Sequence, residues 1–348
     1  MPGLLAPGIV RNEPCPCVNE MAPLLSDPEN SPDAKAKRAA VSAPSAKKAR
    51  GPSYRGVSIS HAERVIDPES GLTKGDLARY YDSVATVIFE QLKNRPVSLV
   101  RAPQGIGSAL FFQKHAEAMR IPGVVKLDAA LMPEHPPLLA IESEAGIVGA
   151  AQMNTVEFHT WNACIDAIEK PDRLVFDLDP GEGVEFATVI EGAQFTLSLL
   201  DALGLKPFVK TSGGKGIHVV VPIVRRYSWQ TAKDFSEAVV KQLVHALPER
   251  FVVKSGPKNR VGKIFVDYLR NAKGATTAAA FSARARSGLG VSMPIDRAEL
   301  ASLKSGSQWT IVNAASYIKE RKHDPWSTYR ASAMRLETAA KKLEFKLS

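Results

Sequence analysis

The stretch from residue 173 to residue 268 constrains the fold most strongly, because short apolar runs alternate there with two long amphipathic segments. Runs of four to eight apolar residues predict strands, and the 3.6-residue period of the longer segments predicts helices. The expected strands are 173–178, 206–211, 217–221 and 263–268, and the expected helices are 185–203 and 228–247. This order contains a β-α-β unit and predicts an α+β domain built on a mixed sheet.

The first half of the chain mixes one helix with short strands. A helix is expected to open at Thr73 and to run to about residue 92. The expected strands are 97–101, 109–113, 138–141, 147–151 and 155–160. Near the end of the chain, the pattern predicts a further helix over 326–343.

Residues 1–53 are predicted to form a flexible linker, because they are rich in Pro, Ala, Ser, Asn and Lys and show no sustained apolar period. The linker contains the pair Cys15 and Cys17 and a basic cluster of Lys35, Lys37, Arg38, Lys47, Lys48 and Arg50. The basic cluster could add non-specific affinity for phosphate, although a solvated tether to other domains of a larger protein is the alternative. The expected folded domain covers 54–343, followed by a tail over 344–348.

The charge balance favours a polyanionic partner. Forty-five Lys and Arg against 36 Asp and Glu give a net charge of +9, an excess that favours nucleic acid, although a solvated basic surface is an alternative. No apolar run is long enough to cross a membrane, and the N-terminus lacks a secretory signal, so we expect no membrane partner and a cytoplasmic location. Three cysteines cannot build a disulfide framework or a four-ligand zinc site.

Two carboxylates lie two residues apart at the end of the strand over 173–178. Because alternate strand residues point to the same face, Asp177 and Asp179 should project together, with Cα atoms about 6–7 Å apart. Their mutual repulsion is relieved by a cation, and hard oxygen ligands suit Mg²⁺ or Mn²⁺. A strand that simply ends in a polar Asp-Pro-Gly turn is the alternative.

A loop with three glycines, 212–216, connects the strands 206–211 and 217–221. Its glycines would let backbone N–H groups converge on an anion, while Ser212, Lys215 and His218 add a hydroxyl, a charge and an imidazole. The spacing is not that of a P-loop, and a strand rather than a helix follows. A tight hairpin with exposed polar residues remains the alternative.

A third acid, Asp267, interrupts the apolar strand 263–268. A buried carboxylate requires a cation or hydrogen-bond donors, and Arg260, Arg270 and Arg284 are near it in the sequence. A structural pair with Arg270 would explain two of these residues and leave Arg260 and Arg284 unexplained. Three acids, an anion-binding loop and several arginines are the components of two-metal nucleotidyl transfer.

In this order, the segments 177–179, 212–218 and 267–271 resemble the three motifs of the archaeo-eukaryotic primase superfamily. More narrowly, the chain from about Tyr54 to Leu343 is similar to the polymerase domain of bacterial ATP-dependent DNA ligase D, and the similarity includes 99–103, 111–115 and 155–161. The resemblance implies an α+β primase-polymerase fold with mixed and antiparallel sheets, in which an RRM-like core is flanked by helices.

The resemblance also implies a role for each matching residue. Asp177, Asp179 and Asp267 would bind two Mn²⁺ or Mg²⁺ ions, and Asp267 would help to activate the primer 3′-hydroxyl. Candidate contacts to the incoming NTP or dNTP are Ser212, Lys215, His218, Arg260, Arg270 and Arg284, with His159 beside them. Phe111 would stack on the incoming base and Phe112 on the template, unless these rings belong to the core. Arg64 and Lys74, ten residues apart, would bind the 5′-phosphate of gapped or broken duplex DNA.

The implied activity is template-directed and template-independent extension of a DNA 3′-hydroxyl during non-homologous end joining, with a preference for ribonucleotides and manganese. The implied partners are DNA and the ligase and nuclease domains of the same larger protein, in a bacterial cytoplasm and on the nucleoid. A primase that starts chains de novo is one alternative. A non-catalytic module that binds DNA ends is another, although acids in a DNA groove are costly unless metals occupy them.

Overall fold

The computed structural model describes residues 51–116 and 121–347. The chain divides into two units, Met1–Lys48 and Ala49–Ser348, and every described residue belongs to the second. The basic cluster, the first two cysteines and all but the last three residues of the expected linker therefore lie outside the described part of the chain. No helix in that part is both long and apolar enough to cross a bilayer.

Six strands form the first sheet, called sheet I, in the order β11-β12-β8-β10-β9-β14. Its strands are β8 (Arg173–Pro180), β9 (Phe208–Thr211), β10 (Ile217–Pro222), β11 (Phe251–Val252), β12 (Ile264–Asp267) and β14 (Pro294–Ile295). Two long helices, α4 (Phe186–Ala202) and α5 (Trp229–Ala246), connect them. The four main strands and both helices match the elements predicted between residues 173 and 268, to within two residues at every helix and strand end.

The strand order shows how these elements are connected. β8 and β9 are both antiparallel to β10 and therefore run parallel to each other with β10 between them. In the same way, β10 and β12 run parallel on either side of β8. Two β-α-β units are thus interleaved in the order β12-β8-β10-β9, which is the arrangement of an RRM-like core. The expected α+β fold with mixed and antiparallel sheets is confirmed.

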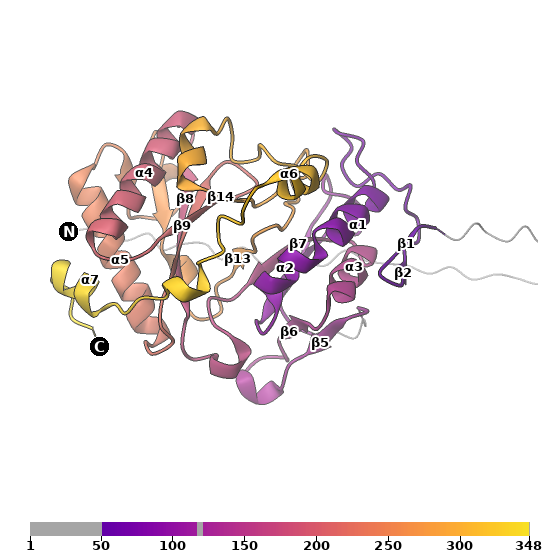
Figure 1. The fold of residues 1–348 in the computed structure, drawn as a ribbon, viewed down its shortest axis with the longest axis horizontal. Helices are drawn as coiled ribbons and strands as arrows, with labels where there is room; N and C mark the ends of the chain where they lie inside the picture. Colours follow the sequence, from indigo (N-terminus) through magenta and orange to yellow (C-terminus); the bar gives the residue numbers. More distant parts are fainter. Residues whose placement is uncertain (1–50, 117–120, 348) are drawn as a thin grey trace, which may run out of the picture. The chain divides into compact units, whose positions relative to one another are not determined.

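Helices α4 and α5 cover one face of sheet I (Figure 1). Gly192 in α4 lies so close to Ile264 of β12 that a Cβ atom at this glycine would come within 2.8 Å of Ile264 Cδ1. Because alternate strand residues face opposite sides, the fully buried Phe176 and Leu178 lie on the helix side, and Asp177 lies on the other.

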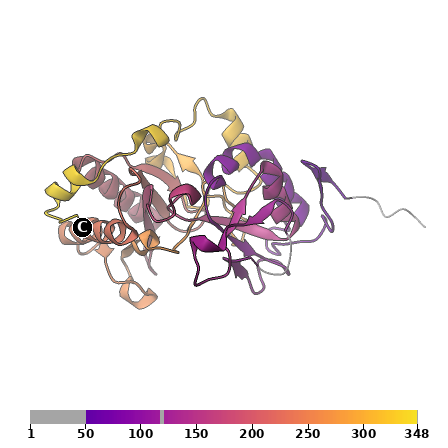
Figure 2. The ribbon, with the colours of Figure 1, turned by 90° about the horizontal axis from the view of Figure 1, so that it is seen from below.

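The second sheet, sheet II, has the order β13-β7-β3-β6-β5, with β4 paired to β3. Its strands are β3 (Val97–Arg101), β4 (Phe111–Gln113), β5 (Val124–Lys126), β6 (Leu139–Ile141), β7 (Thr155–Thr160) and β13 (Thr277–Ala278). The helices packed with it are α1 (Lys74–Ser83), α2 (Ala85–Leu92) and α3 (Glu144–Gln152), which Figure 2 shows from a second direction. A small ribbon of β1 (Ser53–Tyr54) and β2 (Val57–Ser58) and the helices α6 (Ala314–Glu320) and α7 (Glu337–Lys342) complete these elements.

Two predictions of secondary structure were wrong. The segment 147–151, expected as a strand, lies in helix α3, whose first turn is capped by Ser143 Oγ accepting from the Gly146 N–H at 3.2 Å. Glycines let this helix touch the neighbouring backbone, since a Cβ atom at Gly149 would lie 2.2 Å from Pro122 O. The expected helix 326–343 is α-helical only over Glu337–Lys342, because Trp326 folds inward and donates from Nε1 to Val209 O at 3.2 Å.

A smaller difference concerns the helix expected from Thr73 to residue 92. The structure divides it at Val84 into α1 and α2. Its start is as predicted: Thr73 and Asp76 form a reciprocal capping box, in which each side chain accepts from the backbone N–H of the other residue.

Candidate active site

Three carboxylates lie on the face of sheet I that α4 and α5 do not cover. Asp177 of β8 and Asp267 of β12 are direct cross-strand partners, and Asp179 lies two residues further along β8. Opposite residues of an antiparallel pair share a face, and so do residues two apart. The backbone therefore brings together positions 177, 179 and 267, which are distant in the sequence.

The same register extends this line of side chains across two more strands. His218 of β10 is paired with Asp177, and Lys210 of β9 is paired with His218. His218 Nε2 lies 3.3 Å from Asp177 Oδ1, and Lys210 Nζ lies 2.6 Å from His218 Nδ1. Four side chains, from Asp267 to Lys210, thus form one polar row across β12, β8, β10 and β9.

Two arginines neutralise the acids. Arg270 Nε lies 3.0 Å from Asp267 Oδ2 and 3.4 Å from Asp177 Oδ2, and the Arg260 guanidinium pairs with Asp179. The structural pair between Asp267 and Arg270, one of the two alternatives for this acid, is therefore present. Gly181 lets the Arg260 segment approach β8, because a Cβ atom there would overlap Arg260 O at 1.6 Å.

The pKa values of the neighbouring acids Asp177 and Asp267 are shifted in opposite directions. Burial raises the pKa of Asp177, but His218 and Arg270 outweigh burial and hold it below its ordinary value. For Asp267, burial is the largest effect, Asp177 adds repulsion, and together they raise the pKa despite Arg270. An additional cation between the two acids would relieve this repulsion.

The donor chemistry fits hard divalent cations, although the side-chain positions require rearrangement. Among the described residues, no three His, Cys, Asp or Glu side chains converge closely enough to hold an ion as they stand. Asp179 instead faces Arg260, and Arg270 lies between Asp177 and Asp267. Three carboxylates on one face of a sheet suit Mg²⁺ or Mn²⁺ once the arginines leave them.

The glycine loop is built differently from the expected anion cradle. Ser212 Oγ accepts from the N–H groups of Gly214 at 3.1 Å and Gly216 at 3.0 Å, and the Gly213 N–H donates to Gly306 O at 2.9 Å. These three amides are used within the fold, so the expectation that they converge on an anion was wrong. The loop presents cationic side chains instead: Lys215 is exposed, and Arg286, which was not predicted to belong to the site, lies over Gly214.

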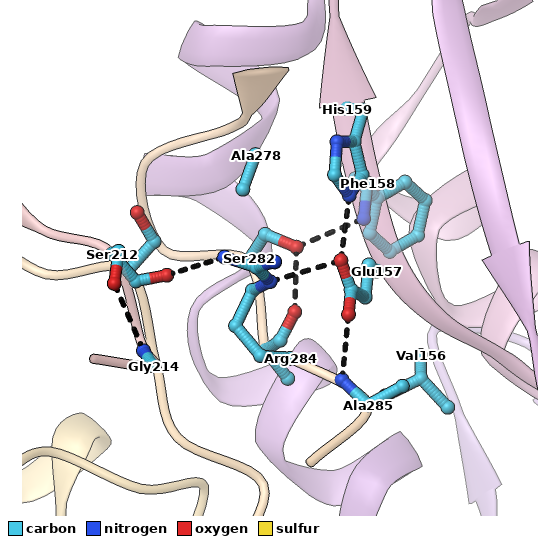
Figure 3. Close-up of polar contacts among 12 residues, drawn as sticks. Val156, Glu157, Phe158, His159, Ser212, Gly214, Ala278, Ser282, Arg284 and Ala285 are labelled. Atoms are coloured by element: carbon cyan, nitrogen blue, oxygen red, sulfur yellow. Dashed lines mark hydrogen bonds and ion pairs between the residues drawn. The ribbon is translucent and has the colours of Figure 1, made fainter. Parts of the chain in front are cut away.

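Glu157 of β7 links the two sheets beside this loop (Figure 3). Its Oε2 accepts from Arg284 Nε at 2.9 Å and lies 2.6 Å from His159 Nε2, and its Oε1 accepts from the Ala285 N–H at 2.7 Å. Arg284 also donates to Ser212 O at 2.8 Å. Sequence reasoning missed Glu157, although an acid within an apolar strand is the same signal that identified Asp267.

The pKa of Glu157 is lowered to about 2: burial opposes the shift, but His159 and Arg284 outweigh it. A carboxyl group whose pKa is lowered by folding stabilises the fold at pH values above its unfolded pKa of 4.5. This stabilisation is lost as the pH falls from 4.5 towards 2. We expect Glu157→Gln to remove a few kcal/mol of this acid-sensitive stability. Urea unfolding between pH 3 and pH 7 would measure it. An unchanged pH dependence in the variant would contradict the assignment.

Phe111 and Phe112 lie on β4 and are 38% and 42% exposed, so the alternative that they are core residues was wrong. The ring of Phe112 lies edge-on to His159, with ring centres 5.6 Å apart. Arg101 Cζ lies 6.0 Å from the centre of the Phe111 ring. Both rings are accessible, and Phe112 adjoins His159, which contacts Glu157.

Arg64 and Lys74 are brought together by the backbone, since the Lys74 N–H donates to Arg64 O at 2.8 Å. Lys74 is only 4% exposed, and its Nζ donates to Ser60 O at 2.9 Å. Burial and the nearby Arg64 charge lower the pKa of Lys74 to about 8. Arg64 donates to Pro103 O at 2.7 Å, while its Nε is buried without a hydrogen-bond partner in the described structure. Two adjacent cations with an unused donor suit an anion.

Known proteins resemble this chain over most of its folded part. Residues 73–326 match the family described as "LigD, primase-polymerase domain". The chain is 50% identical over 288 residues to the multifunctional non-homologous end joining protein LigD of Pseudomonas aeruginosa, covering 82% of this chain and 34% of that protein. It is 32% identical over 252 residues to the multifunctional non-homologous end joining DNA repair protein LigD of Mycobacterium tuberculosis strain H37Rv, covering 70% and 33%.

The chain thus spans about a third of the length of these relatives. A solved structure, the polymerase domain from Mycobacterium tuberculosis ligase D in complex with DNA, superposes with a TM-score of 0.72 at 30% identity, covering 80% of this chain and 99% of that one. The resemblance carried by the three motifs is confirmed, and with it the enzyme class, a nucleotidyltransferase of DNA repair. The chain belongs to the LigD primase-polymerase domain family.

Proposed function

We propose that this protein transfers nucleotides from NTP or dNTP to a DNA 3′-hydroxyl at gaps and broken ends during non-homologous end joining, with and without a template. The observation that carries the proposal is the placement of Asp177, Asp179 and Asp267 on one face of sheet I, beside a loop lined by cationic side chains. Pyrophosphate is the second product of this reaction.

In this proposal, Asp177, Asp179 and Asp267 hold two Mg²⁺ or Mn²⁺ ions. When bound, such ions neutralise the triphosphate and lower the pKa of the attacking hydroxyl. Asp267, the last residue of β12, would help to take the proton of the primer 3′-hydroxyl. The family resemblance, rather than a contact in the structure, supports a preference for manganese and for ribonucleotides.

The cationic side chains would bind the triphosphate. As metal ions take the carboxylates, Arg260 and Arg270 would be released from Asp179 and Asp267 to meet the phosphates, so the charge in the site stays balanced. Guanidinium groups bind phosphate oxygens through paired N–H donors. The other proposed triphosphate contacts are Ser212, Lys215, His218 and Arg284. His159, whose Nε2 lies 2.6 Å from Glu157 Oε2, would lie beside the nucleotide.

The exposed rings of β4 would stack on bases, Phe111 on the incoming base and Phe112 on the template. We expect Phe112→Ala to weaken template-dependent extension by about 5- to 100-fold, since stacking contributes about 1–3 kcal/mol per base. Steady-state extension at varied template concentration would measure the loss. Phe195→Ala, which removes an exposed ring from α4, is the matched control. An equal effect of both substitutions would contradict the role.

Primer extension by the purified full chain tests the proposed function. The assay uses gapped duplexes with and without a downstream 5′-phosphate, each metal separately, and NTP against dNTP. Metal-dependent extension of the primer is the expected result. Synthesis on a bare template would instead indicate de novo priming, and DNA binding without extension would indicate an end-binding module.

The proposed partners follow from the relatives. Because they are multifunctional end-joining proteins of which this chain matches only about a third, we propose that ligase and nuclease domains of the same larger protein act on the same break. Gapped or broken duplex DNA with a 5′-phosphate is the proposed substrate, and the protein would then act on the nucleoid in the bacterial cytoplasm.

A further inference from the structure

Lys210 is the one member of the polar row in sheet I to which the proposed reaction gives no task. It is 3% exposed, and its Nζ lies within hydrogen-bond distance of three groups. These are His218 Nδ1 at 2.6 Å, Ala278 O of sheet II at 3.0 Å and Ser292 Oγ at 2.6 Å. A buried lysine is costly unless such partners replace water.

The hydrogen-bond directions around Lys210 can be assigned. Ala278 O is a carbonyl oxygen and can only accept. Ser292 Oγ donates its own proton to Thr211 O at 2.9 Å, and therefore accepts from Lys210. Two N–H groups of Lys210 are thus committed, and the contact with His218 Nδ1 uses either the third N–H or the lone pair.

Both possibilities give the same result at the far side of the ring. If Lys210 is an ammonium, it donates to Nδ1, and the proton of a neutral His218 must be on Nε2. If Lys210 is neutral, it accepts from Nδ1–H, and Nε2 must also be protonated, because it lies 3.3 Å from the Asp177 carboxylate. Only a ring protonated on Nδ1 alone would put two acceptors face to face.

We infer that Lys210 is a positioning residue that holds His218 with a proton on Nε2, directed at Asp177. This inference rests on the proposed function for its catalytic consequence, since His218 would use the Nε2–H to orient Asp177 and, once metal ions occupy that carboxylate, to donate to the triphosphate. The cross-strand register, which places Lys210, His218 and Asp177 in one line, supplies the geometry.

The pKa values of Lys210 and His218 are both shifted downward. Burial, with Lys210 as the second cause, lowers the pKa of His218 to about 4. Burial also holds the pKa of Lys210 well below its ordinary value, whereas Asp177 opposes this.

Nitrogen-15 NMR of the full chain labelled at histidine tests the inference directly. His218→Asn identifies the His218 signals. The expected wild-type result is a protonated Nε2, and a ring protonated only on Nδ1 would overturn the inference without any further variant. Lys210→Met should change the tautomer or the ring orientation, whereas Ser292→Ala, which leaves the contact to Nδ1, should preserve the Nε2 proton. Identical His218 signals in wild type and Lys210→Met would also overturn it.

A double-mutant cycle measures the catalytic consequence. We expect Lys210→Met to lower kcat/KM for the nucleotide by about 10- to 100-fold, which is typical of residues that orient site groups through a hydrogen bond, and to leave DNA affinity unchanged. Combined with His218→Ala, it should add no further loss. Multiplying losses in a folded double variant would show that Lys210 acts independently of His218.

The two proposals fail in different ways. Extension that survives loss of Asp177 would remove the proposed function and leave the NMR result standing. The reverse pattern, with extension dependent on Asp177 and a ring protonated only on Nδ1, would remove only the role of Lys210.

Discussion

Asp177→Asn should reduce nucleotide incorporation by about 10²- to 10³-fold, because a metal-ion ligand contributes several kcal/mol to charge stabilisation in the transition state. Asn retains the shape of the side chain and removes its charge. It also removes the anion from the centre of the polar row, between Asp267 and His218. Single-turnover primer extension in Mg²⁺ and in Mn²⁺ would measure the loss, and electrophoretic mobility of the DNA complex would show that binding is kept.

A matched control is Asp166→Asn, which breaks an exposed ion pair with Arg225 at 2.8 Å. Exposed pairs contribute little to stability, so extension should be unchanged. If Asp177→Asn retained full activity, the end-binding module would be the better assignment. Parallel thermal melts would separate loss of chemistry from loss of fold.

Lys74→Met should remove most of the preference for gaps that carry a 5′-phosphate, which is the second large expected effect. Hydrogen bonds to charged groups are worth about 1.5–3 kcal/mol, which corresponds to about 10- to 100-fold in affinity. Lys74 lies against Arg64, whose buried Nε lacks a partner in the described structure. The measurement is the ratio of Kd values for duplexes with and without the phosphate.

Lys93→Met provides the comparison, because Lys93 is an exposed lysine with a nearby Glu90. It should leave the phosphate preference intact while removing the same charge. A wild-type protein that is indifferent to the phosphate would take both Arg64 and Lys74 out of the site. Because Lys74 also donates to Ser60 O, the unfolding free energy of its variant should be measured alongside.

The sequence predicted sheet I well because its elements are long and strongly periodic. Strand β8 and helices α4 and α5 lie within two residues of their predicted ends. Helix α3 was not predictable in the same way, because Ile147–Ala151 is apolar throughout and carries no period that separates a strand from a buried helix. Its capping residue, Ser143, was the available signal.

Much of the candidate site could also be predicted, since a carboxylate within an apolar strand points to a partner. That argument brought Asp267 together with Asp177, and it would have identified Glu157 as well. Which acid of β8 lies directly opposite Asp267 could not be predicted, because it depends on strand register. The use of the Gly213 amide was likewise hidden, since Gly306, which accepts from it, lies far away in the sequence.

The polar row imposes a limit on how this protein can vary. Each of its members comes from a different strand, so a single inserted or deleted residue within β8 or β10 would shift the pairing by one position and turn an acid or the histidine to the helix side. Changes in length should therefore be accommodated only in the connections between strands. Surveying natural variants for such insertions would reveal whether the chemistry, rather than the fold alone, fixes the strand lengths.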